Sequence, residues 1–131
     1  MQTIPEQALI VVADGGKARL FRSTGHGHEL RLTEGEHFTH KNIVNDGPSG
    51  ARPSEQSPHQ TDEATFVKQL VNRLDAMFTH NEFAHLVVIA GPQTLGQMRD
   101  AMSKGMAESV AFSLSKDLTN HSTKDIEHAL A

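Results

Sequence analysis

The fold of this protein is decided by residues 9–21, which read LIVVADGGKARLF. The continuous aliphatic run at residues 9–13 is typical of a strand that is buried on both faces. Asp14-Gly15-Gly16 is a turn signal, because glycine adopts positive φ angles without a steric penalty. Residues 17–22 then alternate between the two faces, which indicates an antiparallel partner strand. The stretch therefore predicts a β-hairpin.

After this hairpin, the spacing of apolar residues predicts further strands and helices along the chain. A helix with one apolar stripe, capped by Thr61 or Asp62, follows a long polar segment. Gly91-Pro92 starts a second helix with proline at its first position, and Gly105 is expected to end it. Three more strands are expected at residues 29–38, 86–90 and 109–114, and a last helix with a capping box at residues 122–130. This order predicts one domain, residues 1–131, with a mixed sheet covered by helices.

The composition narrows the class of protein. The chain has 131 residues, enough to bury about two-thirds of the surface of its unfolded form. It contains no cysteine, which excludes disulfides, thiolate catalysis and cysteine zinc sites. Its net charge of −4 gives no general attraction to nucleic acid. Residues 1–7 lack the regions of a signal peptide, and no apolar run approaches the ~18–20 residues of a membrane span, so a cytoplasmic location without membrane insertion is expected.

A polar segment, residues 40–62, separates the third strand from the first helix. It holds three prolines, two glycines and only three aliphatic side chains. A compact domain seldom keeps so long a structureless loop without a use for it. The segment is therefore predicted to be a mobile interaction loop, and Arg52 within it is a candidate binding residue.

Three segments carry a family resemblance. They are residues 10–21 (IVVADGGKARLF), residues 86–96 (LVVIAGPQTLG) and residues 115–119 (SKDLT). In this order and spacing they resemble the bacterial host attachment protein family, described as "protein required for attachment to host cells". The resemblance spans about residues 8–130 and implies a binding function in attachment to host cells.

That family is in turn similar to the middle domain of archaeal and eukaryotic peptide-release factors and of Pelota. The similarity implies a three-layer α/β fold related to the ribonuclease H-like motif, with five mixed strands in the order 3-2-1-4-5 and strand 2 antiparallel. In release factors the long loop carries a Gly-Gly-Gln tripeptide that assists hydrolysis of peptidyl-tRNA. Residues 40–62 lack this tripeptide and are slightly acidic, whereas an RNA-lined site needs phosphate neutralisation. The resemblance therefore implies a release-factor-like domain without the hydrolytic motif.

The residues that can carry chemistry favour binding over catalysis. The start of the second helix follows a parallel strand, where open α/β sheets bind ligands and where N–H groups stabilise anions. A simple helix cap is the alternative there. The candidate binding residues are Asp14, Gly15, Gly16, Lys17, Arg52, Gly91, Gln93, Thr94 and Asp117. No catalytic residue, metal site or cofactor is predicted.

One carboxylate keeps a nuclease hypothesis open. Ribonuclease H-type nucleases use a carboxylate on the first strand, with further carboxylates that hold two metal ions. Asp14 stands at that place, and Glu34, Glu36 and Asp117 are its conceivable companions. The alternative for Asp14 is turn chemistry before two glycines.

Two further groups of residues have catalytic or metal-binding types. The histidines His26, His28, His37 and His40 can ligate transition metals, but no carboxylate spacing completes a site, so solvated histidines are expected. The polar loop also contains the residue types of a hydrolytic triad, in Ser54, Ser57, His59 and Asp62. A mobile loop cannot pre-organise such a triad, so no hydrolase is expected from it.

The main hypothesis is a non-catalytic binding module implicated in attachment to host cells, with a host-cell surface as partner. The first alternative is a translation-associated protein that binds ribosome or tRNA without hydrolysis, and the second is a metal-dependent nuclease. The edge of the third strand, or helices with surface methionines, leaves a homodimer open. Most helical methionines are nevertheless expected in the core, namely Met77, Met98, Met102 and Met106.

Overall fold

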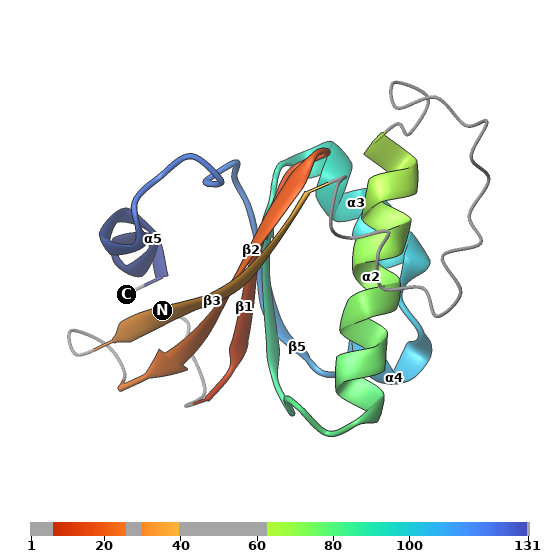
Figure 1. Cartoon of the computed structure of the whole chain (residues 1–131), viewed down its shortest axis with the longest axis horizontal. Helices are drawn as coiled ribbons and strands as arrows, with labels where there is room; N and C mark the ends of the chain where they lie inside the picture. The colour runs from red at the N-terminus through yellow and green to blue at the C-terminus, as the bar shows by residue number, and fades with distance from the viewer. Residues whose placement is uncertain (1–6, 26–29, 40–62, 131) are drawn as a thin grey trace.

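The computed structural model describes residues 7–25, 30–39 and 63–130. In these ranges a five-stranded sheet lies between helices on both of its faces, as Figure 1 shows nearly edge-on. The strands are β1 (Leu9–Ala13), β2 (Lys17–Thr24), β3 (Arg31–Thr39), β4 (Leu86–Ala90) and β5 (Val110–Ser115). The helices are α2 (Glu63–Thr79), α3 (Pro92–Ala101), α4 (Lys104–Glu108) and α5 (Thr123–Leu130). The predicted three-layer α/β class is confirmed.

The sheet has the strand order β3-β2-β1-β4-β5. β1 pairs antiparallel with β2 and parallel with β4, while β4 and β5 are parallel. β2 also pairs antiparallel with β3. The predicted order, with strand 2 antiparallel to its neighbours, is therefore confirmed. This order leaves β3 and β5 as the two edges of the sheet.

The central strands β1 and β4 are buried along their whole length. Their side chains alternate between two apolar clusters. Val11 and Val88 belong to the cluster under α2, α3 and α4, whereas Ile10 and Val87 belong to the cluster under α5. Because both faces are covered, each strand needs apolar residues at every position, which explains the unbroken aliphatic runs in the sequence.

Helix α2 provides most of the cover on the first face. Its predicted apolar stripe is confirmed, since Phe66, Leu70 and Leu74 have no exposed surface. The helix ends in a Schellman motif around Asn81, whose φ of 62° is left-handed. The N–H of Glu82 donates to the carbonyl of Met77 at 2.9 Å, which satisfies one of the last carbonyls of the helix. The end predicted near residues 80–81 is therefore correct.

The prediction that Gly105 ends the second helix is wrong. Helix α3 stops at Ala101, and Met102 is extended. Ser103 then caps a new short helix, α4, by accepting a hydrogen bond from the N–H of Met106 at 3.2 Å. Gly105 lies inside α4, where an added Cβ would meet the Phe78 ring at 3.3 Å. Glycine therefore permits the close approach of α4 to α2 rather than ending a helix.

The remaining boundaries lie within two residues of their predictions. The third strand occupies Arg31–Thr39 and the last strand Val110–Ser115. The capping serine is confirmed, because Ser122 Oγ accepts from the N–H of Asp125 at 3.1 Å. Three of the four helical methionines are buried as predicted, Met77, Met98 and Met106, whereas Met102 is partly exposed. Residues 40–62, predicted to be a mobile loop, lie outside the described residues.

Candidate functional site

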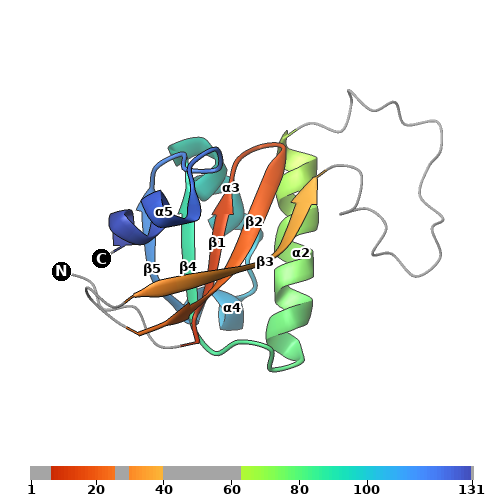
Figure 2. The same cartoon turned by 60° about the vertical axis from the view of Figure 1, so that its left-hand side comes forward.

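Three of the segments singled out in the sequence meet at one end of the sheet. β1, β4 and β5 all terminate there, and this end is called the carboxyl edge below (Figure 2). It consists of the β1–β2 turn at residues 14–17, the start of α3 at residues 91–94 and the loop at residues 116–121 that follows β5. The chain leaves β1 toward β2 on one side and leaves β4 toward β5 on the other, so the strand order reverses between β1 and β4. Open α/β sheets bind ligands at such a reversal.

Asp14 organises the turn. Its Oδ1 accepts hydrogen bonds from the N–H groups of Gly16 at 2.8 Å and Lys17 at 2.9 Å. Its Oδ2 accepts a third hydrogen bond from the hydroxyl of Thr119 at 2.8 Å. Both carboxylate oxygens are thus engaged in holding the backbone and the loop after β5, which is the turn chemistry given as the alternative role of Asp14.

Thr119 joins the two aspartates of the edge. Its hydroxyl lies 2.8 Å from Asp14 and 2.9 Å from Asp117 Oδ1, and its side chain is buried. A hydroxyl has one proton, so it donates to one of these carboxylates at a time. The backbone N–H of Thr119 also approaches Asp117 Oδ1 at 3.4 Å. Asp14 and Asp117, named as conceivable companions from the sequence, are therefore brought together by Thr119, a residue that was not predicted as part of the site.

Arg19 connects the β1–β2 hairpin to the loop after β5 through hydrogen bonds. Its Nε and Nη2 form a fork on the Glu34 carboxylate at 3.0 and 3.1 Å. Its Nη1 donates to the carbonyls of Thr119 at 3.1 Å and His121 at 2.6 Å. The guanidinium also lies over the Phe21 ring, 5.1 Å from its centre. Hydrogen bonding from Arg19 holds the pKa of Glu34 below its ordinary value.

Lys17 lies beside this network. Its Nζ donates to Asn120 Oδ1 at 2.5 Å, which connects the turn and the loop a second time. Lys17 also pairs with Thr39, the last residue of β3, in the β2–β3 ladder. A shallow cavity of about 250 Å³ lies here, lined by Lys17, Arg19, Glu34, His37, Thr119 and their neighbours Ala18, Phe38 and Thr39.

The start of α3 completes the carboxyl edge. Gly91 is the N-cap, with φ −61° and ψ 165°, and Pro92 occupies the first turn. No described side chain caps this end of the helix, although the Gly91 carbonyl accepts from the N–H of Leu95 at 2.8 Å. Gln93 is exposed and Thr94 is buried. Within the described residues, the positive end of the helix dipole is therefore left without a capping or acidic first-turn side chain.

Of the carboxylates named in the nuclease hypothesis, Asp14 and Asp117 meet at the Thr119 hydroxyl, but Glu34 and Glu36 lie on opposite sides of the sheet. Glu34 is held by Arg19 on the α5 side of the sheet, whereas Glu36 lies 3.5 Å from Arg73 of α2 on the other side. The β2–β3 ladder has a register shift between Arg19 and Phe21, and this shift turns the Glu34 and Glu36 side chains toward opposite faces of the sheet. Across the described residues, no group of three or more histidines and carboxylates is placed to hold a metal ion.

Several candidate residues cannot be placed. Arg52, His26, His28 and His40 lie outside the described residues, as do the loop residues Ser54, Ser57, His59 and Asp62. His37 is described and is exposed on β3. Within the described ranges, no helix is long and apolar enough to cross a bilayer.

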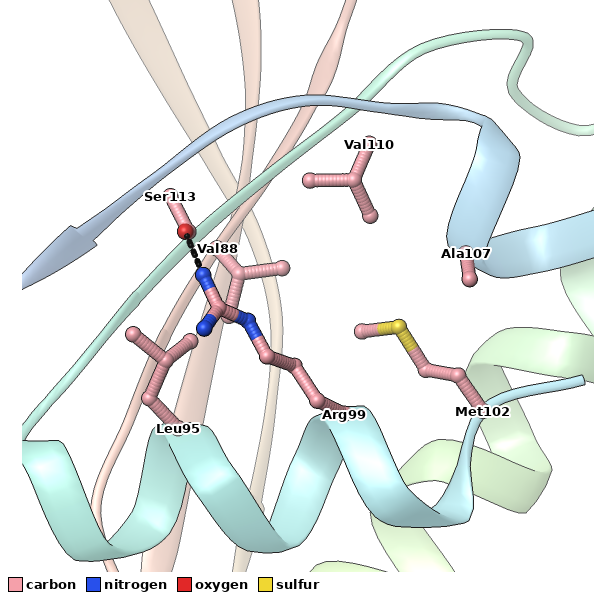
Figure 3. Close-up of a pocket in the computed structure, with 7 residues that line it drawn as sticks. All are labelled: Val88, Leu95, Arg99, Met102, Ala107, Val110 and Ser113. Atoms are coloured by element: carbon pink, nitrogen blue, oxygen red, sulfur yellow. Dashed lines mark hydrogen bonds between the residues drawn. The ribbon is translucent and has the colours of Figure 1, made fainter. Parts of the chain in front are cut away.

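A second hollow, of about 400 Å³, lies away from the carboxyl edge between α3, α4 and the strands β4 and β5. Figure 3 shows its lining, which is apolar apart from Arg99 and Ser113. The Arg99 Nη2 donates to Ser113 Oγ at 2.8 Å across the hollow. Sequence reasoning did not find this hollow, because its lining comes from four elements.

No curated protein is matched by the sequence. A family model described as "Bacterial archaeo-eukaryotic release factor family 12" matches residues 7–130, nearly the whole chain. The match confirms the predicted relationship to release-factor domains, while attachment to host cells stays a prediction. The chain belongs to bacterial archaeo-eukaryotic release factor family 12.

Proposed function

We propose that this protein is a non-catalytic binding module that contacts an RNA-containing partner of the translation machinery, ribosome or tRNA, through its carboxyl edge. Lys17 and the backbone of Gly91, Gln93 and Thr94 are the contacting groups in this proposal. Asp14 and Asp117 act indirectly, since they hold the turn and the loop in place.

The observation that carries the proposal is the meeting of the three segments at the switch point of the sheet. Two of the segments offer groups that suit phosphate. Lys17 provides an ammonium group. In the part of the chain that the structure describes, α3 begins without a side-chain cap, so its first N–H groups can face an anion. Phosphate contacts of this kind position a protein on RNA without reading its sequence.

A non-catalytic role is supported by the state of Asp14. A general base or a metal ligand needs a free lone pair directed at the substrate or the ion. The Asp14 carboxylate accepts two hydrogen bonds from its own turn, and its second oxygen lies 2.8 Å from the hydroxyl that Thr119 shares between Asp14 and Asp117. Holding the surface rigid is consistent with binding, whereas proton transfer would break the contacts that keep the edge together.

β3 reaches this end of the molecule just before the polar insert begins in the sequence. β3 ends at Thr39, which pairs with Lys17, and the chain is next described at the start of α2. In release factors, the corresponding loop carries Gly-Gly-Gln, and residues 40–62 contain no such tripeptide. Family membership together with this loss supports binding at a release-factor-like location without peptidyl-tRNA hydrolysis.

Co-sedimentation with ribosomes tests the proposal. We expect the protein to pellet with ribosomes at about 50 mM salt and less at about 200 mM, because phosphate contacts release counterions. Lys17→Glu should weaken binding by about tenfold, since it reverses one contact. Lys68→Glu, an exposed change on α2, is the matched control and should bind like the unmodified protein. Protein that stays in the supernatant at both salt concentrations would contradict the proposal.

Attachment to host cells is the second candidate function. The observation that favours it is the agreement of residues 10–21, 86–96 and 115–119 with the host attachment family. Direct attachment requires the protein to reach the bacterial surface. Protease treatment of intact cells should then degrade it while a cytoplasmic marker survives, and complete protection of the protein would leave only an indirect role.

A further inference from the structure

The two edges of the sheet differ in how they are protected. Exposed edge strands offer unpaired N–H and C=O groups to other strands, and proteins usually block them with charges, bulges or proline. β3 carries Arg31, Glu34, Glu36 and His37, and its ladder with β2 contains a register shift. It is therefore blocked in two ways.

Among the described residues, no charge or proline of β5 itself protects the other edge. It reads VAFSLS over Val110–Ser115, with no charged residue and no proline. Its only irregularity is a register shift near its start, between Leu86 and Val87 of β4. Residues 112–115 follow that shift in regular pairing with β4, so their outer side is a straight, neutral edge.

Apolar side chains flank this edge on both faces. Phe112 and Leu114 are only partly buried and pack against the cluster under α5. Val110 and Met102 are partly buried on the opposite face, where they line the hollow of about 400 Å³ shown in Figure 3. A partner strand along β5 would therefore gain main-chain hydrogen bonds and cover apolar surface on both sides.

We propose that a second copy of this chain occupies β5, in an antiparallel pairing with Ser113 on the two-fold axis. This register places Phe112 of each copy opposite Leu114 of the other, on the α5 face. Aromatic and aliphatic cross-strand pairs of this kind stabilise antiparallel sheets. The result is a continuous ten-stranded sheet across the dimer.

The chemistry of β5 selects a second copy as the partner. A two-fold interface brings identical surfaces together, so it excludes strands that would set like charges opposite each other. β5 has no charge to oppose, and its pattern of Phe112 and Leu114 around Ser113 is complementary to itself. β3 does not meet this condition. In most registers its charged side chains would lie opposite charged side chains of the second copy.

One charged side chain lies close to the proposed axis. Arg99 is exposed and donates to Ser113, so two copies of it would stand near each other on the α3 face. Solvent and salt screen such a pair. We therefore expect the dimer to hold or tighten as salt rises to about 0.5 M, which is opposite to the salt effect expected for ribosome binding.

Sedimentation velocity on charge variants tests the interface. The unmodified chain should sediment as a dimer of twice its 14.3 kDa. Ala111 and Ser115 are exposed and lie near each other across the proposed axis. The double variant A111K/S115K should raise the dissociation constant at least about tenfold through like-charge pairs, whereas A111K/S115E should stay within about threefold of the unmodified chain. Equal weakening by both variants would overturn the register.

Cysteine cross-linking gives a second readout, because the chain has no cysteine of its own. Ser113→Cys should form an intermolecular disulfide under mild oxidation, since facing residues of antiparallel strands lie within disulfide range. Thr33→Cys, at an exposed position of β3, is the matched control and should stay monomeric on a non-reducing gel. A chain that is monomeric at all concentrations, or one that cross-links equally through Thr33→Cys, would overturn the proposal.

Discussion

The two faces of the sheet differ in the size of their apolar clusters. The face under α2, α3 and α4 has a continuous apolar cluster that runs from Phe66 on α2 to Met106 on α4. The face under α5 has one eight-residue helix, whose buried anchors are Ile126 and Leu130. Near the carboxyl edge of that second face, polar contacts of Arg19 and Asp14 hold the chain between β5 and α5.

One face mainly stabilises the fold, whereas the other also carries the proposed binding surface. Burial of apolar surface is non-directional and fixes the first face firmly. The second face has a smaller apolar cluster, to which a few directional contacts are added, so we expect its C-terminal segment to open at lower free energy than the rest of the fold. Its polar contacts also build the proposed binding surface, and the substitutions below test whether the two faces respond differently.

The largest effect is expected on the first face. Leu70→Ala removes a fully buried side chain from the centre of α2 and leaves a cavity, which should lower the free energy of unfolding by about 2–5 kcal/mol. Urea denaturation measures this loss. Asn72→Ala, at an exposed position on the same helix, is the control and should change stability little. A Leu70→Ala cost below that of the α5-face variants would reverse the comparison.

A smaller and more local effect is expected from Arg19→Ala. The substitution removes the fork on Glu34 and both contacts to the carbonyls of the loop, at a cost of about 1.5–3 kcal/mol. Amide hydrogen exchange should rise in residues 118–130 while α2 keeps its protection. Arg19→Lys keeps the charge but lacks the planar fork, so it should restore only part of the loss. Uniform exchange across the molecule would argue against a separate α5 face.

Thr119→Val probes the contact between the two aspartates. It keeps the buried shape but removes the hydroxyl that Asp14 and Asp117 share, which should cost about 1–2 kcal/mol. Thr119→Ser retains the hydroxyl and serves as the control. If the proposed function holds, Thr119→Val should also weaken co-sedimentation with ribosomes. Unchanged binding would show that ribosome binding does not need this contact.

The smallest effect concerns pH. Hydrogen bonding from Arg19 lowers the pKa of Glu34 in the folded protein below 4.5, so the unfolded chain binds its proton first as pH falls. The stabilising contribution of this contact is therefore present above about pH 4.5 and is lost as pH falls through the lowered pKa. Glu34→Gln should lose less stability than the unmodified protein between about pH 5 and pH 3, as measured by urea denaturation at each pH. Parallel curves would show that solvent screens the pair.

Much of the fold was readable from local sequence. The run at residues 9–13 and the glycine turn predict the hairpin, because a doubly buried strand and a tight turn leave strong compositional marks. Gly105 misled the prediction because glycine is used in two ways. It often ends helices, but in this fold it allows α4 to lie against Phe78, a residue on another helix.

Only some residues of the candidate site could be predicted from the sequence. Gly15, Gly16, Lys17 and the start of α3 were predicted from turn and helix-start signals, which are local. Arg19 and Thr119 were missed, because their roles depend on partners about a hundred residues away in the chain. Nothing in the residues around Arg19 indicates that its guanidinium will bind the carbonyls of the loop after β5.

The amino-acid sequence was sufficient for the α/β class, because periodicity and turn chemistry act over a few residues. The family resemblance carried by three contiguous segments was sufficient for the strand order and for the relationship to release-factor domains. The tertiary structure alone decided which side chains meet at the carboxyl edge, which faces Glu34 and Glu36 take, and which edge strand is left unprotected. These properties arise from strand pairing between distant segments, where one shift in register moves a side chain to the opposite face.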